Sequence, residues 1–415
     1  MSTATTSTMG RDARVLTLVS TGHFMSHYSQ MVLPPLFPLM AADYGVGYAA
    51  LGLIITLINA SGAMVQIPVG FLVDRIGAKS LLVAGLLIKT FALGAMAFTD
   101  SYEMLLVLAV LAGIGHSVFH PADYAILMSS IDESRIGRAF SVHTASGNAG
   151  SAIAPLLILM IAAQWGWKTA LVSIAILGAV TALAMILQSS VLQDHVGAKK
   201  KKKDDGVPSH AGNSLIEGIK LLLRPQILIL YMFFLITAMI TVGINTFTVT
   251  GLTQVHGTSL TMAGTALTTY LVAGLVGILV GGVIADKTGR HNVIAAAAFV
   301  ITAGLMIVIG LYDLSPPLLM ATYAVIGVVM GLIRPARDMM AKALTQKGDS
   351  GKMFGFMSNG HFVGAAIVPV LLGWVIDQGQ AQWVFWLCAI FAITALLSLM
   401  TTTVGTKKTD QVPKV

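Results

Sequence analysis

The stretch of sequence that decides the fold runs from Gly113 to Pro155 and reads GIGHSVFHPADYAILMSSIDESRIGRAFSVHTASGNAGSAIAP. Its pattern predicts an apolar helix, a short charged turn and a second helix. The same pattern returns at residues 327–369, a constant offset of 214 positions. The residues that recur are Gly113 and Gly327, Pro121 and Pro335, Ala122 and Ala336, Gly137 and Gly351, Phe140 and Phe354, Gly150 and Gly364, Ala152 and Ala366, Ile153 and Ile367, and Pro155 and Pro369. A repeat that holds through helix, turn and helix indicates that one half of the protein duplicates the other.

The composition is that of a membrane protein. Of the 415 residues, 56% are hydrophobic and 10% are charged, whereas soluble domains carry about 25% charged residues. The first apolar run contains His23, His27 and three prolines, so we expect a retained membrane span rather than a cleaved signal. The one cysteine, Cys388, excludes a disulfide framework and argues against a cysteine metal site.

Twelve segments have the length that a membrane crossing requires. A helix that spans about 30 Å of hydrocarbon needs roughly 20 residues. The segments are approximately 14–40, 48–73, 80–98, 104–130, 137–161, 167–188, 225–250, 260–284, 292–312, 317–341, 352–376 and 382–403. We therefore predict an all-α membrane protein with twelve transmembrane helices in two pseudo-symmetric six-helix halves.

The division into halves falls at the one long polar interval. Residues 1–188 form the predicted N-terminal half, 189–214 a basic cytoplasmic linker, and 215–415 the C-terminal half with a cytoplasmic tail. The linker holds an unbroken run of lysines from Lys199 to Lys203, for which membrane anchoring is a sufficient role and a partner-binding patch the alternative.

Charge sets the expected orientation. The basic residues outside the spans lie on the termini and on alternate turns of one side, with Lys168 as the exception. The opposite turns carry Asp43, Asp100, Glu103, Asp313 and Asp377. Because cytoplasmic loops are rich in Lys and Arg, we expect both termini to be cytoplasmic.

A second repeated motif lies in two corresponding turns. The sequence from Gly70 to Gly77 is GFLVDRIG, and the sequence from Gly282 to Gly289 is GVIADKTG. Twelve spans in two halves, with G-x-x-x-D-[RK]-x-G after the second and eighth spans, resemble the major facilitator superfamily. The resemblance implies a secondary transporter whose central cavity opens alternately to either side as the halves rock. It also implies a conformational gate at the motif turns, with Asp74, Arg75, Gly77, Asp286, Lys287 and Gly289. We expect Arg138 of span 5 and Arg337 and Asp338 of span 10 to belong to the same gate.

Other residues are similar to the fosmidomycin-resistance branch of that superfamily. They are His23, Gln30 and Pro38 in span 1, Ser117 to Pro121 in span 4, and Gly147 to Pro155 in span 5. This resemblance implies a bacterial inner-membrane protein associated with drug export. The chain departs from the branch at His27 and Ala122, where the branch has acids, so the coupling mechanism and the direction of transport stay open.

Six of the ten histidines fall inside predicted spans, where each ionisable side chain costs roughly 2.5–3.5 kcal/mol on insertion scales. Helical spacing places His23 and His27 on one face, His116 and His120 on another, and Asp123 one turn beyond His120. Interhelical hydrogen bonding is the structural alternative, but the concentration in spans 1, 4, 5 and 11 favours a function. Imidazole titrates near physiological pH. We therefore predict proton coupling by His27, His120 and Asp123.

Span 10 carries two arginines. Guanidinium groups stay charged and bind carboxylate or phosphonate oxygens with two hydrogen bonds. Arg334, which replaces His120 in the repeat, is expected to contact an anionic substrate, with a gate role as the alternative. For Arg337, which replaces Asp123, pairing with Asp338, Asp123 or a helix end in the inner gate is favoured. Lys89 lies in mid-span, where it either snorkels to the surface or finds a carboxylate.

The sequence thus predicts a monomeric, proton-linked transporter of a small, anionic organic compound or drug, with export favoured and metabolite uptake as the alternative. The predicted substrate-binding residues are His23, His27, Tyr28, Gln30, His116, His120, Tyr124, His143, Asn148, Asn245, Arg334 and His361. Transport of copper or zinc through the histidines and the 22 methionines is a further alternative, although we assign no resident metal. No P-loop, dinucleotide fingerprint or nucleophile elbow is present, so neither an enzyme, a cofactor nor a nucleic-acid partner is expected.

Overall fold

The computed structural model describes residues 2–132, 135–192, 224–288, 290–344 and 350–401. All regular structure in these ranges is helical. The elements of the N-terminal half are α1 (Ser2–Gln30), α2 (Leu33–Tyr44), α3 (Tyr48–Ile76), α4 (Ala78–Ala95), η1 (Met96–Phe98), α5 (Tyr102–His116), α6 (Phe119–Ser130), α7 (Ile136–Leu187) and η2 (Ser189–Val191). Those of the C-terminal half are α9 (Pro225–His256), α10 (Leu260–Lys287), α11 (His291–Leu311), α12 (Pro316–Leu344), α13 (Ser350–Asp377) and α14 (Trp383–Thr401).

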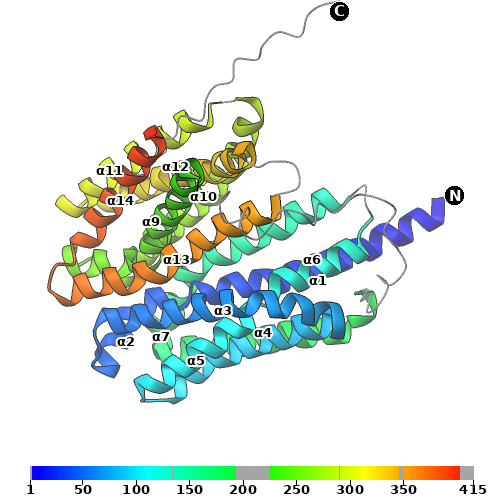
Figure 1. The fold of residues 1–415 in the computed structure, drawn as a ribbon. Helices are drawn as coiled ribbons and strands as arrows, with labels where there is room; N and C mark the ends of the chain where they lie inside the picture. Colours follow the sequence, from blue (N-terminus) through cyan, green and yellow to red (C-terminus); the bar gives the residue numbers. More distant parts are fainter. Residues whose placement is uncertain (1, 133–134, 193–223, 289, 345–349, 402–415) are drawn as a thin grey trace, which may run out of the picture.

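The helices account for twelve membrane spans within the described ranges. Ten segments are long and apolar enough to cross a membrane. One of them, α7, contains two spans, because Gly166 interrupts its 52 residues with φ 82° and ψ 157°. Helices α1 and α2 together form the remaining span. The predicted all-α fold in two six-helix halves is confirmed, and Figure 1 shows the two bundles side by side.

Two spans that the sequence predicts as continuous are broken. Helix α1 ends at Gln30 and α2 begins at Leu33, with Pro34 and Pro35 in its first turn. Helix α5 ends at His116 and α6 begins at Phe119, again with a proline in the first turn. Proline has no N–H to continue the hydrogen bonds of a preceding helix, but it fits the start of a new one. The prolines therefore explain why a new helix begins after each break.

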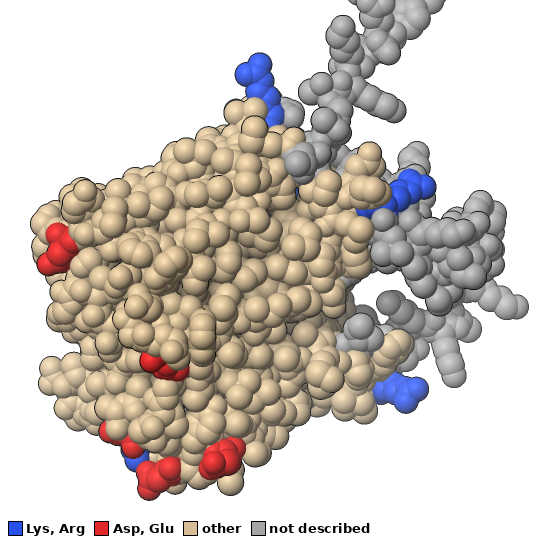
Figure 2. All heavy atoms as spheres, turned by 60° about the vertical axis from the view of Figure 1, so that its left-hand side comes forward, with Lys and Arg blue, Asp and Glu red and all other residues tan. Residues whose placement is uncertain are grey.

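Charge divides the molecule into two ends. Figure 2 shows acidic side chains gathered at the left of the molecule and most basic ones at the right. We call the end with Asp43, Asp100 and Asp377 the acidic end, and the end with Arg75 and Arg290 the basic end. The lysine run of the predicted linker lies outside the described residues.

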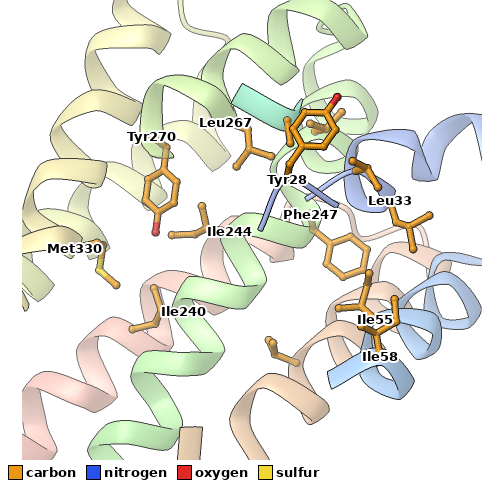
Figure 3. Packing of buried hydrophobic residues seen from close by; sticks show 14 of the residues in the cluster. Tyr28, Leu33, Ile55, Ile58, Ile240, Ile244, Phe247, Leu267, Tyr270 and Met330 are labelled. Carbon is orange, nitrogen blue, oxygen red and sulfur yellow. The ribbon is translucent and has the colours of Figure 1, made fainter. Parts of the chain in front are cut away.

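Among the described residues, the halves meet chiefly where α3 packs on α13, α7 on α10 and α2 on α9. Figure 3 shows Phe247 of α9 directed at Ile55 and Ile58 of α3, beside Leu33 of α2. The ring of Phe247 also lies 6.0 Å from that of Phe37 in α2, centroid to centroid. This apolar contact closes the space between the halves towards the acidic end.

A hydrogen-bonded cap reinforces this closure. Helix α3 begins after Gly47, and its first amides receive no side-chain cap from their own segment. The carboxylate of Asp377, at the end of α13 in the other half, accepts hydrogen bonds from the backbone N–H of Tyr48 at 2.6 Å and of Ala49 at 2.9 Å. A side chain at Gly47 would collide with this carboxylate. A carboxylate at a helix N-terminus satisfies free amides and interacts favourably with the helix dipole.

Asp377→Ala is predicted to weaken closure of the acidic end. Loss of an N-cap costs about 1 kcal/mol, so the population open at the acidic end should rise roughly fivefold. Double electron–electron resonance between spin labels on the acidic-end turns of the two halves measures this shift. Glu103→Ala is the matched control, because Glu103 accepts a hydrogen bond from Ser101 in its own half. An equal shift in both variants would show that Asp377 acts only through surface charge.

Candidate functional site

A cavity of about 350 Å³ lies between the halves. Both halves line it, and eight predicted substrate-binding residues are among the lining side chains. They are His27, Gln30, His116, His120, Asn148, Asn245, Arg334 and His361. Such a volume suits a small organic molecule. The other four predicted residues, His23, Tyr28, Tyr124 and His143, do not line this cavity, and Tyr28, His23 and His143 are buried beside it.

Behind the cavity wall lies a buried carboxylate held by two imidazoles. Asp123 of α6 has no solvent exposure, and His23 of α1 and His143 of α7 are 4% and 1% exposed. Nδ1 of His23 lies 3.1 Å from Oδ2 of Asp123, within hydrogen-bond distance. Nε2 of His143 lies 3.4 Å from the same oxygen, and the two rings are stacked with centroids 3.8 Å apart. The sequence associated Asp123 with His120, one turn away, but His23 and His143 are the imidazoles that lie against its carboxyl group.

Several polar atoms in this region have no hydrogen-bond partner among the described residues. They are Oδ1 of Asp123, both ring nitrogens of His143, Nε2 of His27 and Nδ1 of His120. Nε2 of His143 is close to Oδ2 of Asp123, at 3.4 Å, but makes no hydrogen bond to it. Buried polar atoms are normally paired, and those that are not often mark a functional position. The cluster therefore has unused capacity to accept or pass a proton.

Two imidazoles connect this cluster to the cavity. The ring of His23 lies 4.6 Å from the ring of His27 and 5.5 Å from that of His120, centroid to centroid. Both His27 and His120 line the cavity. His27 is also oriented by Ser151 of α7, whose Oγ lies 3.2 Å from Nδ1. We call His23, His27, His120, His143 and Asp123 the histidine–aspartate cluster.

Glycines on α7 allow this cluster to form. A Cβ at Gly147 would lie 2.6 Å from Cδ2 of His23 and 3.0 Å from Cδ2 of His27. One turn along, a Cβ at Gly150 would collide with the backbone of Phe24 in α1. Close backbone approach is the property that glycine gives to transmembrane helices. The glycines of the Gly113–Pro155 stretch therefore set the distance at which α1 and α7 place their histidines.

Lys89 of α4 departs from both sequence expectations, since it neither snorkels nor pairs with a carboxylate. Its side chain is buried, with 1% exposure. Nζ donates a hydrogen bond to the carbonyl oxygen of Ser26 at 2.5 Å and lies 3.1 Å from Nδ1 of His116. Close packing brings these groups together, because a Cβ at Gly115 would lie 2.6 Å from the backbone nitrogen of Lys89. The charge of Lys89 in an apolar span was the sequence signal for this contact, but it did not identify the partner.

The arginines of α12 differ in their surroundings. Arg334 lines the cavity with an exposed side chain, so its guanidinium is accessible to solutes. Arg337 bonds Asp338, with Nε 3.2 Å from Oδ1, and its guanidinium lies 4.4 Å from the ring centroid of Phe234 in α9. The predicted pair of Arg337 with Asp338 is present. The alternative prediction, that Arg337 pairs with Asp123, is wrong in this structure. Asp123 instead contacts two histidines of its own half.

The gate turns are described in part. Gly77 has φ 99° and joins α3 directly to α4, a backbone geometry that favours glycine. Arg75, Arg138 and Lys287 are exposed at the basic end. The side chains of Asp74 and Asp286, and the whole of Gly289, lie outside the described residues. The gate therefore stays a prediction.

The histidine–aspartate cluster also resembles a metal site in its spacing. One ligand atom each of His23, Asp123 and His143 lie within 4.8 Å of one another. Two imidazole nitrogens and a carboxylate oxygen are suitable donors for zinc or copper. The sequence assigned no metal here, and this geometry keeps the transition-metal alternative open.

Comparison with known proteins identifies the family. The family model described as Major Facilitator Superfamily matches residues 19–253 and 236–414. The chain belongs to the major facilitator superfamily. It is therefore a multi-pass membrane protein of a transporter family, as the paired turn motifs predicted.

The relatives within the superfamily include two drug-resistance proteins and a probable nitrate transporter. The chain is 26% identical to the fosmidomycin resistance protein of Escherichia coli over 400 residues, which cover 93% of this chain and 92% of that protein. It is 24% identical to a multi-drug resistance efflux pump of Streptococcus pneumoniae over 391 residues, covering 89% and 92%. A probable nitrate transporter of Staphylococcus carnosus is 25% identical over 154 residues, 37% of this chain and 39% of that protein.

Solved structures of the superfamily share the fold. The crystal structure of a nucleoside transporter has a TM-score of 0.77 at 14% identity, covering 93% of this chain and 99% of that one. A bacterial homolog of the human lysosomal transporter Spinster, in an inward-facing and occupied conformation, has a TM-score of 0.74 at 14% identity, covering 94% and 96%. At such identities the likeness establishes the fold alone.

Gly147→Ala is predicted to disrupt the histidine–aspartate cluster. The added methyl group would press on the rings of His23 and His27 and displace them from Asp123 and Ser151. Overpacking of this kind costs about 1–3 kcal/mol, so thermal unfolding in detergent should occur at a lower temperature. Gly137→Ala on the same helix is the control, because nothing lies within 4 Å of its added Cβ. Equal unfolding temperatures for the two variants would contradict the close packing described here.

Proposed function

We propose that this protein is a proton-linked transporter of a small, anionic organic compound, and that it acts as a monomer in the bacterial inner membrane with both termini cytoplasmic. The observation that carries the proposal is the exposed guanidinium of Arg334 inside the cavity, opposite the histidines of the other half. A permanent positive charge within a membrane span is costly. Its position in a solvent-accessible cavity favours the recognition of an anion.

Neutral polar groups around Arg334 support recognition of a molecule larger than a single ion. Asn245 of α9 and His361 of α13 lie on its side of the cavity, and Asn148 of α7 and Gln30 of α1 face them from the N-terminal half. Apolar walls from Ile55, Ile58 and Met330 accompany these groups. A few polar groups in a mostly apolar pocket are typical of sites for small organic ligands.

Proton coupling is assigned to the histidine–aspartate cluster. His27 and His120 are the members in contact with the cavity, and Asp123 is the buried end of the chain of contacts. His23, between them, can pass a proton because each imidazole has two ring nitrogens. The sequence-based proposal of His27, His120 and Asp123 is thereby extended to His23 and His143.

Export is the favoured direction, and the two drug-resistance relatives support it. The match extends over about nine-tenths of the length of each of these two relatives, but over a much shorter part of the nitrate transporter. Uptake of a metabolite remains the alternative. In either direction, rocking of the halves would open the acidic end. The motif turns with Arg75 and Lys287, together with Arg337 and Asp338 of α12, would act as the gate at the basic end.

Arg334→Ala is predicted to weaken specific anion transport. A charge-assisted hydrogen bond contributes about 1.5–3 kcal/mol, so apparent affinity should fall roughly 10- to 100-fold. The measurement is flux in proteoliposomes under an imposed pH gradient, with organic carboxylates and phosphonates as the screened solutes. Arg334→Lys should recover part of the flux, because lysine keeps the charge but loses the two-point geometry. Arg14→Ala removes a surface charge at the basic end and serves as the control.

Asp123→Asn is predicted to separate transport from the proton gradient. The amide preserves the size of the side chain but cannot take up and release a proton at physiological pH. Gradient-driven accumulation should therefore fall at least roughly tenfold, the equivalent of about 1.4 kcal/mol, while exchange of labelled for unlabelled substrate continues. Asp100→Asn, at the acidic end, is the control. Accumulation that survives in Asp123→Asn would remove this carboxylate from the coupling mechanism.

The geometry of His23, Asp123 and His143 favours transition-metal transport as a second candidate function. The same vesicles distinguish the two. Zinc or copper flux that requires His23 and His143, and that is unchanged in Arg334→Ala, would replace the anion proposal.

A further inference from the structure

Lys89 lies at the meeting point of the two broken spans. It contacts Ser26, in the last turn and a half of α1, and His116, the final residue of α5. Both positions are near the C-terminal end of a helix, where backbone carbonyls carry partial negative charge and favour a cation. Within the part of the chain that the structure describes, no carboxylate lies within ion-pair distance of Nζ. The helix ends are therefore the groups available to stabilise Lys89 as an ammonium ion, since no acid neutralises it.

As an ammonium ion, Lys89 would determine the hydrogen-bonding state of His116. A lysine ammonium has three donors and no acceptor. Its contact with Nδ1 of His116 at 3.1 Å is attractive only if that nitrogen carries a lone pair. The hydroxyl of Ser26, 3.2 Å from the same nitrogen, can donate to it as well. The neutral imidazole then carries its proton on Nε2, and His116 lines the cavity.

The environment of His116 consequently differs from that of the other histidines. Protonation of His116 would place a second N–H against the ammonium group of Lys89, and like charges in a low-dielectric interior repel strongly. His23 and His143 instead lie against the carboxyl group of Asp123. Among the described residues, His116 is the histidine whose ring nitrogen faces a lysine side chain.

We propose that Lys89 fixes His116 as a neutral hydrogen-bond donor, and that His116 thereby forms a subsite of the N-terminal half for an oxyanion group of the substrate. This inference rests on the proposed transport of an anion and deepens it. Nε2–H of His116 would bind one oxygen of a carboxylate or phosphonate, and the positive charge of Lys89 behind the ring would strengthen that bond. Arg334 provides the cationic group of the other half, so one anion would contact both halves across the cavity. Lys89 acts as a positioning residue because it reaches the substrate only through His116.

The tautomer of His116 tests the first part of the proposal. In protein labelled with ¹⁵N-histidine and held in lipid nanodiscs, ¹⁵N chemical shifts distinguish Nε2–H, Nδ1–H and imidazolium forms, and His116→Gln identifies the signals. We expect the Nε2–H form in the unmodified protein throughout pH 5–8. In Lys89→Met, a second form or a titration should become visible, and Lys89→Arg should restore the original signal. An Nδ1–H form or an imidazolium at His116 in the unmodified protein would overturn the proposal.

The substrate subsite is tested with two amide substitutions that do not depend on the folding of a Lys89 variant. Glutamine can present an N–H near the position of Nε2, whereas asparagine matches the position of Nδ1 and leaves the cavity side without a donor. Acetate and methylphosphonate are the probes in the vesicle assay. His116→Asn should raise KM roughly tenfold, as expected for a lost hydrogen bond to a charged group, and His116→Gln should raise it less. In both variants kcat should change less than KM.

The outcomes separate this inference from the function on which it rests. Lys168→Met, a cation removed at the acidic end, is the control for Lys89→Met. If anion transport occurs, but His116→Asn and His116→Gln have equal KM values and Lys89→Met leaves the tautomer unchanged, the subsite is disproved and the transport function stands. A second outcome is that neither probe nor any screened anion is transported, while the Nε2–H tautomer still depends on Lys89. In that case the proposed function and its oxyanion subsite are disproved, and only the orienting role of Lys89 remains.

Discussion

The burial of Asp123 is the constraint on which the N-terminal half depends. A carboxyl group without solvent exposure is costly to bury unless nearby polar groups compensate it. Here the compensation comes from His23 and His143, which belong to two other helices. Three helices must therefore meet at one point, and the small residues of α7 allow them to do so. A low dielectric strengthens both the attraction within such a group and the penalty for any unpaired member. This makes the cluster sensitive to a gain or loss of one proton.

The repeat has produced a symmetric fold with asymmetric chemistry. In the C-terminal half, Arg334 and Arg337 occupy the positions that correspond to His120 and Asp123. At these positions one half therefore carries an imidazole and a carboxyl group, which can gain or lose a proton, and the other carries guanidinium groups, whose charge is permanent. In the proposed mechanism, the first half exchanges protons and the second attracts the anion. Contacts such as Asp377 with the start of α3 bring the halves together at the acidic end, so each event can influence the same closure.

Much of the fold could be predicted because its signals are local or repeated. Runs of about 20 apolar residues specify membrane helices, and the turn motifs and the constant offset specify two matched halves. Several cavity residues, Arg334 and His361 among them, followed from polar side chains placed in predicted cavity-lining spans. The breaks after Gln30 and His116 were missed, although Pro34, Pro35 and Pro121 were visible. Proline within a membrane span is compatible with either a kinked helix or a new one, and the neighbouring helices decide between them.

The sequence by itself determined the membrane location, the twelve spans, the duplication and the presence of ionisable groups where lipid would exclude them. The tertiary structure decided which of those groups are partners. Asp123 contacts His23 and His143, which are distant in the chain, and Lys89 contacts His116 through the close packing of α4 and α5. Helical periodicity specifies the face on which a side chain lies, but it does not specify how two helices are rotated and shifted against each other. That choice is made by packing between helices, where small residues allow contact and buried polar atoms require partners.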